Sequence, residues 1–357
     1  MRILFSRSGG STISALLSPL LQGLQRPVVA AAKFLFRQQS VMTAVESQSS
    51  LHHHLLCLPR RACSGRRNDS VVVVMGATGT GKSKLSIDLA TRFPSEVVNS
   101  DKIQVYRGLD ITTNKIPLAD RCGVPHHLLG ELDPAVGELP ALKFRSLAAS
   151  AIERIAARRR LPVVAGGSNS FIHALLAARH DPLVDPFAAG DSRRGRRERL
   201  RYRCCFLWVD VEPKVLAEYL DLRVEEMVAA GMVEELEAYF AGEGAEPGRH
   251  PGLEKAIGVP EFREYFKKGK GAGEYAAAVA AIKVNGRRLA EEQVRKIGRL
   301  GEGGCGWALQ RVDATAAVRA RLGGSAWVAA WERDVVGPSV AAVEGFLESS
   351  LSPPLGS

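Results

Sequence analysis

The stretch Val71-Val72-Val73-Val74-Met75-Gly76-Ala77-Thr78-Gly79-Thr80-Gly81-Lys82-Ser83 decides how the chain is organised. It starts as an apolar run of strand length and leads directly into the spacing Gly76-x-x-x-x-Gly81-Lys82-Ser83. Beyond it, Leu85, Ile87 and Leu89 continue in a pattern that is compatible with a helix. Strand, glycine-rich loop, lysine, hydroxyl and helix thus follow one another in the order of a phosphate-binding loop.

The expected phosphate ligands are the loop residues themselves. Glycines allow a tight turn in which successive N–H groups point at an anion, and the positive end of the new helix faces the same place. Lys82 adds a full charge, and the Ser83 hydroxyl is placed to bind a Mg²⁺ carried by the phosphates. The predicted contacts are Gly76, Ala77, Thr78, Gly79, Thr80, Gly81, Lys82 and Ser83. A glycine-rich turn without a ligand is the alternative, and the loop does not reveal whose phosphates it holds.

The charge of the chain is concentrated in its first 68 residues. The 357 residues include 48 Lys and Arg against 38 Asp and Glu, a net charge of +10. Residues 1–68 hold nine basic residues and one acid, Glu46, so they account for +8 and leave about +2 for the rest. A chain of this length buries a sizeable core, and the part after the leader has the charge of an ordinary globular domain.

The leader is rich in Ser and Arg, which is typical of an organellar transit peptide. Its apolar pieces are too short for a membrane span, so no membrane segment is expected. We predict a plastid location; a mitochondrial or cytosolic location and a tail without an address are the alternatives. The six cysteines show no C-x-x-C spacing, which predicts free thiols in a reducing compartment and no zinc site.

Two further strands are predicted to end beside the loop. Glu96–Asn99 is followed by Ser100 and Asp101, and Leu161–Ala165 is followed by Gly166, Gly167 and Ser168. Ligands collect at the carboxyl ends of parallel strands, so Asp101 and Ser168 can reach the same pocket. A helix cap at Asp101 and a simple tight turn at Ser168 remain open.

Several motifs resemble the isopentenyltransferase family, and specifically its plant adenylate dimethylallyltransferases. The resemblance covers about residues 70 to 346, nearly everything after the leader. The blocks that carry it are Asn99-Ser-Asp-Lys-Ile-Gln-Val-Tyr106, Gly123-Val-Pro-His-His-Leu-Leu-Gly130, Gly166-Gly-Ser-Asn-Ser-Phe-Ile-His173, Phe206-Leu-Trp-Val-Asp210, Arg223-Val-x-x-Met227 and Ala256-Ile-Gly-Val-Pro-Glu-Phe262.

The resemblance implies transfer of a dimethylallyl group from its diphosphate to N6 of adenine, with Mg²⁺ at the leaving group. It implies that Asp101 accepts the proton of the amine and that Lys82 and Arg223 contact the diphosphate. Lys283 is expected to line a substrate pocket. For Arg223 the alternative is a surface ion pair with a helical neighbour.

The acceptor is predicted to be AMP, ADP or ATP. The transfer-RNA branch of the family generally has Asp-Ser-Met-Gln where this chain has Asp101-Lys-Ile-Gln, and Cys305 has no C-terminal partner for a zinc finger. The arginine run from Arg193 to Arg203 is interpreted as a solvated linker, so no nucleic acid is expected. Transfer RNA is the alternative acceptor. A further alternative is a nucleotide-binding relative with impaired catalysis, because Glu254 and Glu292 stand where relatives usually carry Arg.

The predicted fold is α/β: a parallel sheet like that of P-loop NTPases, flanked by helices, with the loop at its centre and a smaller helical subdomain. His126 and His127 are interpreted as a structural turn. The oligomeric state is not predicted. The predicted divisions are a leader at 1–68, a core at 69–211, a helical substrate subdomain at 212–300, a return to the core at 301–347 and a tail at 348–357.

Overall fold

A computed structural model describes residues 70–188, 198–301 and 304–349. The predicted leader at 1–68 and nearly all of the tail at 348–357 lie outside the described residues, as does most of the arginine run. The body described below belongs to the unit Gly65–Ser357. Within the described residues, no helix is long and apolar enough to cross a membrane.

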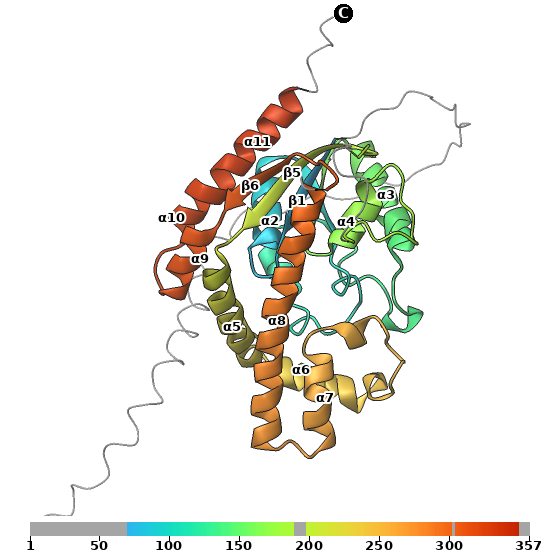
Figure 1. The fold of residues 1–357 in the computed structure, drawn as a ribbon, viewed down its shortest axis with the longest axis vertical. Coiled ribbons are helices and arrows are strands. Elements are labelled where there is room, and N and C mark those ends of the chain that lie inside the picture. The colour runs from blue at the N-terminus through green and yellow to red at the C-terminus, as the bar shows by residue number, and fades with distance from the viewer. Residues whose placement is uncertain (1–69, 189–197, 302–303, 350–357) are drawn as a thin grey trace, which may run out of the picture. The chain divides into compact units, whose positions relative to one another are not determined.

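Six parallel strands form one sheet in the order β3-β2-β4-β1-β5-β6 (Figure 1). The strands are β1 (Ser70–Gly76), β2 (Ser95–Asn99), β3 (His126–His127), β4 (Leu161–Gly166), β5 (Arg203–Asp210) and β6 (Leu309–Asp313). β1 lies between β4 and β5, which explains why its residues are almost all apolar: both faces of a central parallel strand are covered. The predicted α/β fold with the loop strand at the centre is confirmed.

The alternation of side chains along β1 supplies two layers of core. Val71, Val73 and Met75 join one cluster of buried side chains, while Val72 and Val74 join the other. The first cluster includes residues of α3 (Ala141–Ala157) and α4 (Asn169–Leu176). The second includes residues of α2 (Lys82–Arg92) and α11 (Gly337–Glu348). Helices therefore cover both faces of the sheet.

A helical region follows β5. It consists of α5 (Pro213–Ala229), α6 (Met232–Ala241), α7 (Val259–Lys267) and α8 (Ala272–Leu300). The 29 residues of α8 span about 43 Å at 1.5 Å per residue, and they lead from the α6–α7 end back to β1 (Figure 1). Residues far apart in the sequence can therefore reach the phosphate-binding loop from α5 and α8.

After α8 the chain returns to the sheet. β6 pairs with β5, and α9 (Thr315–Leu322), α10 (Val328–Trp331), the π-helical turn η5 (Glu332–Val336) and α11 follow. The sequence pattern missed α9 and α10, because α9 is surrounded by exposed arginines and has almost no apolar stripe.

His126 and His127 do not form a turn, so that prediction is wrong. They form the edge strand β3, whose backbone pairs with Val97 and Val98 of β2. Nε2 of His127 lies 2.7 Å from Oε2 of the buried Glu96, while Nδ1 of His126 lies 2.8 Å from the Val124 carbonyl. Pairing with β2 overrode the weak local signal, because two residues are too few for a recognisable strand period.

Candidate active site

Backbone conformation at three glycines shapes the phosphate-binding loop. Gly79 and Gly81 have φ values of 83° and 93°, in the left-handed region that only glycine adopts readily. At Gly76, a β-carbon would lie 2.4 Å from the Val209 carbonyl oxygen. Because α2 begins at Lys82, its first N–H groups have no acceptor within the helix and are oriented as an anion site requires.

Lys82 is half-buried within this loop. Its Nζ donates a 2.6 Å hydrogen bond to the Ala77 carbonyl. Burial lowers the pKa of Lys82 to about 8; the charge of Asp101 opposes the shift, and that of Arg223 adds to it. These influences place the three predicted catalytic side chains within electrostatic reach of one another. Ser83, on the first turn of α2, is exposed to solvent, where its hydroxyl is accessible to a ligand.

Asp101 lies just past the carboxyl end of β2. Its Oδ1 accepts hydrogen bonds from the backbone N–H groups of Ile103 at 3.0 Å and Gln104 at 3.3 Å. Oδ1 therefore acts as a cap, as the alternative interpretation expected, but the capped element is a turn and no helix follows. Within the described chain Oδ2 makes no hydrogen bond. The carboxylate is thus fixed in orientation by one oxygen while the other is available for chemistry.

Arg223 reaches the loop from α5. Its Nη1 lies 3.3 Å from Oγ1 of Thr78, and a β-carbon at Gly79 would lie 3.3 Å from the same nitrogen. Nε is buried and has no hydrogen-bond partner among the described residues. Burial also lowers the pKa of this guanidinium. Arg223 is therefore in contact with the loop and is no surface ion pair.

Gln293 of α8 is a site residue that the sequence analysis did not identify. Its Oε1 accepts a 2.7 Å hydrogen bond from the Thr78 N–H, and its Nε2 donates to the Gly167 carbonyl at 3.0 Å. A β-carbon at Gly167 would lie 2.4 Å from Nε2. One buried amide thus connects the phosphate-binding loop to the loop after β4. Glu291 and Glu292 precede Gln293 in the sequence, but no residue spacing predicts its contact with Thr78.

Ser168 and Lys283, the two remaining predicted substrate-binding residues, form contacts with residues outside the phosphate-binding loop. The Ser168 hydroxyl accepts a 2.8 Å hydrogen bond from the Lys102 N–H, so it joins the loop after β4 to the turn after Asp101. Nζ of Lys283 lies 2.8 Å from Oε1 of Glu225, which forms an ion pair between α8 and α5. Within the described residues, no hydrogen bond or ion pair joins Lys283 to the phosphate-binding loop. The substrate-binding roles of both residues remain predictions.

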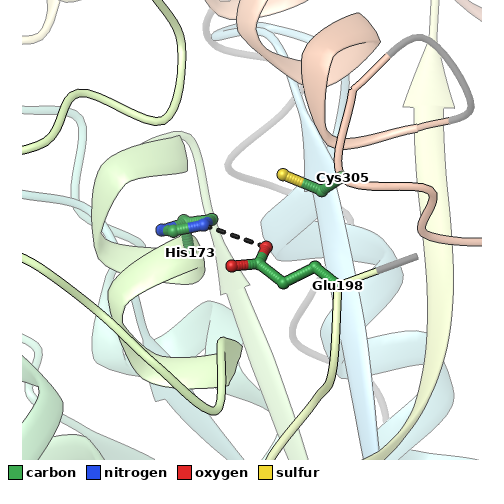
Figure 2. Close-up of side chains that lie close together, drawn as sticks. All are labelled: His173, Glu198 and Cys305. Carbon is green, nitrogen blue, oxygen red and sulfur yellow. Dashed lines mark hydrogen bonds and ion pairs between the residues drawn. The ribbon is translucent and has the colours of Figure 1, made fainter. Parts of the chain in front are cut away.

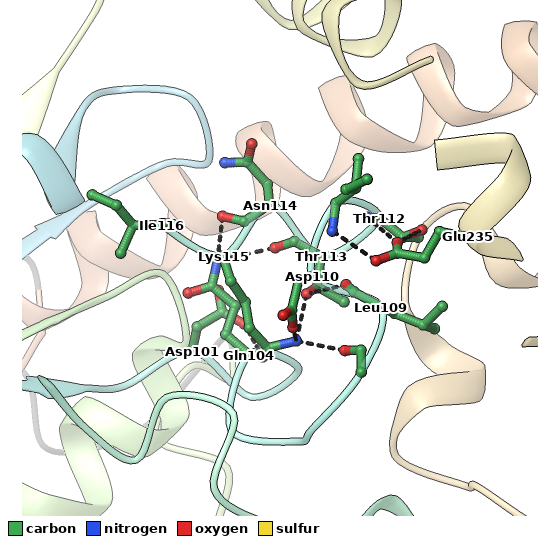
Figure 3. A network of polar contacts seen from close by, with 12 residues as sticks. Asp101, Gln104, Leu109, Asp110, Thr112, Thr113, Asn114, Lys115, Ile116 and Glu235 are labelled. Atoms are coloured by element: carbon green, nitrogen blue, oxygen red, sulfur yellow. Dashed lines mark hydrogen bonds and ion pairs between the residues drawn. The ribbon is translucent and has the colours of Figure 1, made fainter. Parts of the chain in front are cut away.

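The segment that follows Asp101 is held by a polar network (Figure 3). Glu235 of α6 accepts hydrogen bonds from the N–H groups of Ile111 at 3.0 Å and Thr112 at 2.8 Å. Nζ of Lys115 is buried and lies 2.9 Å from Oδ1 of Asp110. The helical region therefore fixes the loop that begins at the predicted base, and Glu235 is a second positioning residue that sequence patterns missed.

Both acidic departures from the family pattern have partners. Oε1 of Glu254 accepts a 2.7 Å hydrogen bond from the Gly248 N–H. Hydrogen bonds from Arg295 and Lys296 lower the pKa of Glu292 to about 2. Each acid thus has a local structural role, and within the described chain neither forms a hydrogen bond or ion pair with the phosphate-binding loop.

Comparison with known proteins places the chain in a family. It matches the family described as IPP transferase over residues 104–194 and 184–297. It is 50% identical over 299 residues to adenylate isopentenyltransferase 1, chloroplastic, of Arabidopsis thaliana, covering 80% of this chain and 83% of the relative. The chain belongs to the IPP transferase family. A second relative, adenylate isopentenyltransferase of Humulus lupulus, is 50% identical over 296 residues, which are 77% of this chain and 89% of that protein.

Solved structures of IPP transferases share the fold. A eukaryotic dimethylallyltransferase acting on tRNA aligns with a TM-score of 0.64 at 24% identity, covering 81% of each chain. The tRNA isopentenylpyrophosphate transferase of Bacillus halodurans aligns with a TM-score of 0.60 at 22% identity, covering 80% of this chain and all of that one. At this identity the likeness supports the fold, while the acceptor is a separate question.

Proposed function

We propose that this chain transfers the dimethylallyl group of dimethylallyl diphosphate to N6 of the adenine of AMP, ADP or ATP and releases diphosphate, the first step of cytokinin synthesis. The observation that carries the proposal is 50% identity with a named adenylate isopentenyltransferase over 80% of the chain. The geometry is compatible with the proposal, because the phosphate-binding loop, Arg223 and Asp101 lie close together at the carboxyl ends of the parallel strands.

The loop suits the leaving group of this reaction. Breaking the allylic C1–O bond leaves positive charge on carbon and negative charge on diphosphate. Loop N–H groups, the Lys82 ammonium and the Arg223 guanidinium would stabilise that negative charge without reorganisation. Diphosphate oxygens would compete with the Ala77 carbonyl for the Lys82 ammonium, and they would favour its protonated form.

Asp101 suits the role of proton acceptor. The exocyclic amine of adenine is a weak nucleophile, so a carboxylate that takes its proton as the C–N bond forms lowers the barrier. Two backbone N–H groups hold Oδ1, which fixes the carboxylate and leaves Oδ2 as the proposed acceptor. The charge of Asp101 opposes the lowering of the Lys82 pKa, which supports a position for Asp101 near the proposed leaving-group end of the site.

The exposed Ser83 hydroxyl is an oxygen donor of the kind that Mg²⁺ prefers, so it fits a magnesium ion carried by the phosphates. We propose that Ser83 would hold it. When bound, Mg²⁺ supplies further positive charge at the leaving diphosphate.

We propose a plastid location. Relatives of 50% and 48% identity are named chloroplastic, whereas one of 40% identity is named mitochondrial. The basic, acid-poor composition of residues 1–68 is typical of a transit peptide. Fusion of residues 1–68 to a fluorescent protein tests the proposal, and fluorescence confined to mitochondria or cytosol would contradict it.

The decisive experiment incubates the protein with dimethylallyl diphosphate, Mg²⁺ and one acceptor at a time: AMP, ADP, ATP or an RNA stem-loop with an unpaired adenosine. We expect N6-prenylated nucleotide by mass spectrometry and no prenylated RNA. Product on RNA alone would overturn the proposed acceptor. Nucleotide binding without product would instead favour impaired catalysis.

A further inference from the structure

Three side chains from distant parts of the sequence meet outside the proposed active site (Figure 2). His173 belongs to α4, Glu198 precedes β5, and Cys305 lies in the loop before β6. One ligand atom from each lies within 4.8 Å of the others. Nε2 of His173 and Oε2 of Glu198 are 3.1 Å apart. Sequence spacing does not reveal this group, because its members are 25 and 107 residues apart.

The donor set is that of a zinc site. Imidazole nitrogen, carboxylate oxygen and thiolate sulfur are the three ligand types that Zn²⁺ takes in proteins. Tetrahedral coordination at ordinary bond lengths needs donor atoms about 3.3 to 3.6 Å apart. The imidazole and carboxylate atoms are 3.1 Å apart and all three ligand atoms lie within 4.8 Å of one another, so small side-chain rotations would bring them to this range. The carboxylate and the thiolate would also balance the charge of a divalent cation.

The surroundings hold the cluster together. His173 is 3% exposed, and its ring stacks on Trp307 with centroids 5.9 Å apart and planes 10° apart. The Glu198 N–H donates a 2.9 Å hydrogen bond to the Cys305 carbonyl, which joins two of the three segments directly. Two of the segments that carry the ligands are therefore joined before any ion binds, which reduces the cost of ordering them.

We propose that His173, Glu198 and Cys305 bind a divalent cation of the zinc type in a structural site. Glu198 and Cys305 precede β5 and β6, so the cluster lies near the amino ends of the parallel strands. The phosphate-binding loop follows the carboxyl end of β1. The ion would thus join α4 to the segments that enter β5 and β6, and this proposal is independent of the proposed function.

A fourth position is available. The ring of His180 lies 5.9 Å from that of His173, and within the described chain both of its buried ring nitrogens lack a hydrogen-bond partner. His180 also lines a pocket of about 460 Å³. Nδ1 of His173 has no hydrogen-bond partner among the described residues. In most metal sites the ring nitrogen of histidine that does not bind the metal donates a hydrogen bond, which strengthens metal binding. Because Nδ1 of His173 lacks such a bond, we expect an affinity for Zn²⁺ about 10- to 100-fold below that of sites that have it.

Titration of the full chain with Co²⁺, followed by displacement with Zn²⁺, tests the proposal. Because the leader contains His52-His53-His54, Cys57 and Cys63, the background protein carries Ala at the three histidines and Ser at the two cysteines. We expect one equivalent of Co²⁺ with a thiolate-to-cobalt charge-transfer absorption, and loss of that absorption when Zn²⁺ is added. Absence of a stoichiometric band would overturn the proposal.

Variants identify the ligands. Cys305→Ser should abolish the band and weaken Zn²⁺ binding at least tenfold, whereas Cys122→Ser, at an exposed cysteine, should change neither. Glu198→Gln should keep the band but weaken binding, and it serves as the second variant if circular dichroism shows that Cys305→Ser does not fold. An unchanged band in folded Cys305→Ser would show that another thiolate holds the Co²⁺, and unchanged affinity in Glu198→Gln would show that the carboxylate is no ligand; either result would overturn the proposal.

Discussion

The phosphate-binding loop draws its groups from eight consecutive residues, Gly76 to Ser83, whereas the helical region contributes single side chains from distant positions. In the loop, backbone conformation and the start of α2 orient the N–H groups. From α5 and α8, Arg223 and Gln293 reach the same loop only because both helices pack against it. The comparison teaches that the loop supplies a general anion site, while the helices determine how that site is held and completed.

Removal of the Lys82 side chain is the strongest test of how much the phosphate-binding loop contributes to prenyl transfer. We expect Lys82→Ala to lower kcat/KM for prenyl transfer by about 1,000-fold, because a charge aimed at the leaving diphosphate is lost. Lys84→Ala is the matched control, since Nζ of Lys84 pairs with Asp88 at 2.9 Å. Steady-state kinetics with the donor varied measure both. More than a tenth of wild-type activity in Lys82→Ala would contradict the role of the loop.

Asp101 tests the chemistry that the loop alone does not supply. Asp101→Asn keeps an oxygen for the N–H groups of Ile103 and Gln104 but removes the basic carboxylate. We expect kcat to fall about 100-fold with little change in KM. Asp133→Asn, at an exposed cap that Asn also satisfies, is the control. A matching loss in both variants would argue for a structural effect.

The pH dependence of the rate tests the lowered pKa of Lys82, on which burial and the charges of Asp101 and of Arg223, a residue of the helical region, act. Burial lowers the pKa of Lys82 from 10.5 to about 8, so above about 8 the neutral amine predominates and donor binding weakens. We expect kcat/KM for the donor to decline above that pH, approaching about tenfold per unit. In the same window the unfolded chain binds more protons than the folded chain, so the Lys82 contribution to stability rises with pH.

Rate profiles and urea unfolding across this pH range, each compared with Lys82→Met, measure the two opposite trends. A profile that stays flat well above pH 8, or that is identical in the variant, would place the ionisation elsewhere.

The smallest expected effect belongs to Gln293. Gln293→Ala leaves the Thr78 N–H and the Gly167 carbonyl without their partner, which should cost about 1 to 3 kcal/mol of unfolding free energy. We expect donor KM to rise a few-fold, because the loop loses its connection to α8. Gln310→Ala, at an exposed glutamine, is the control in urea unfolding. Equal unfolding free energies of the two variants would contradict the role of Gln293 in connecting the two loops.

Local patterns predicted the parts of the site that depend on neighbouring residues. The apolar β1, the glycine spacing and the position of Asp101 after β2 all follow from short stretches, because strand period and glycine conformation act locally. The two-residue strand β3 could not be predicted in this way, since its existence depends on pairing with β2.

By itself the sequence determined the α/β fold, the loop strand at the centre of the sheet and membership of a family recognisable from motifs. Only the tertiary structure decided that Gln293 bridges two loops, that Glu235 holds the segment after Asp101 and that His173 meets Glu198 and Cys305. The reason is physical: these contacts join residues from 25 to 215 positions apart, and only the packing of helices and loops in the folded chain brings such residues together.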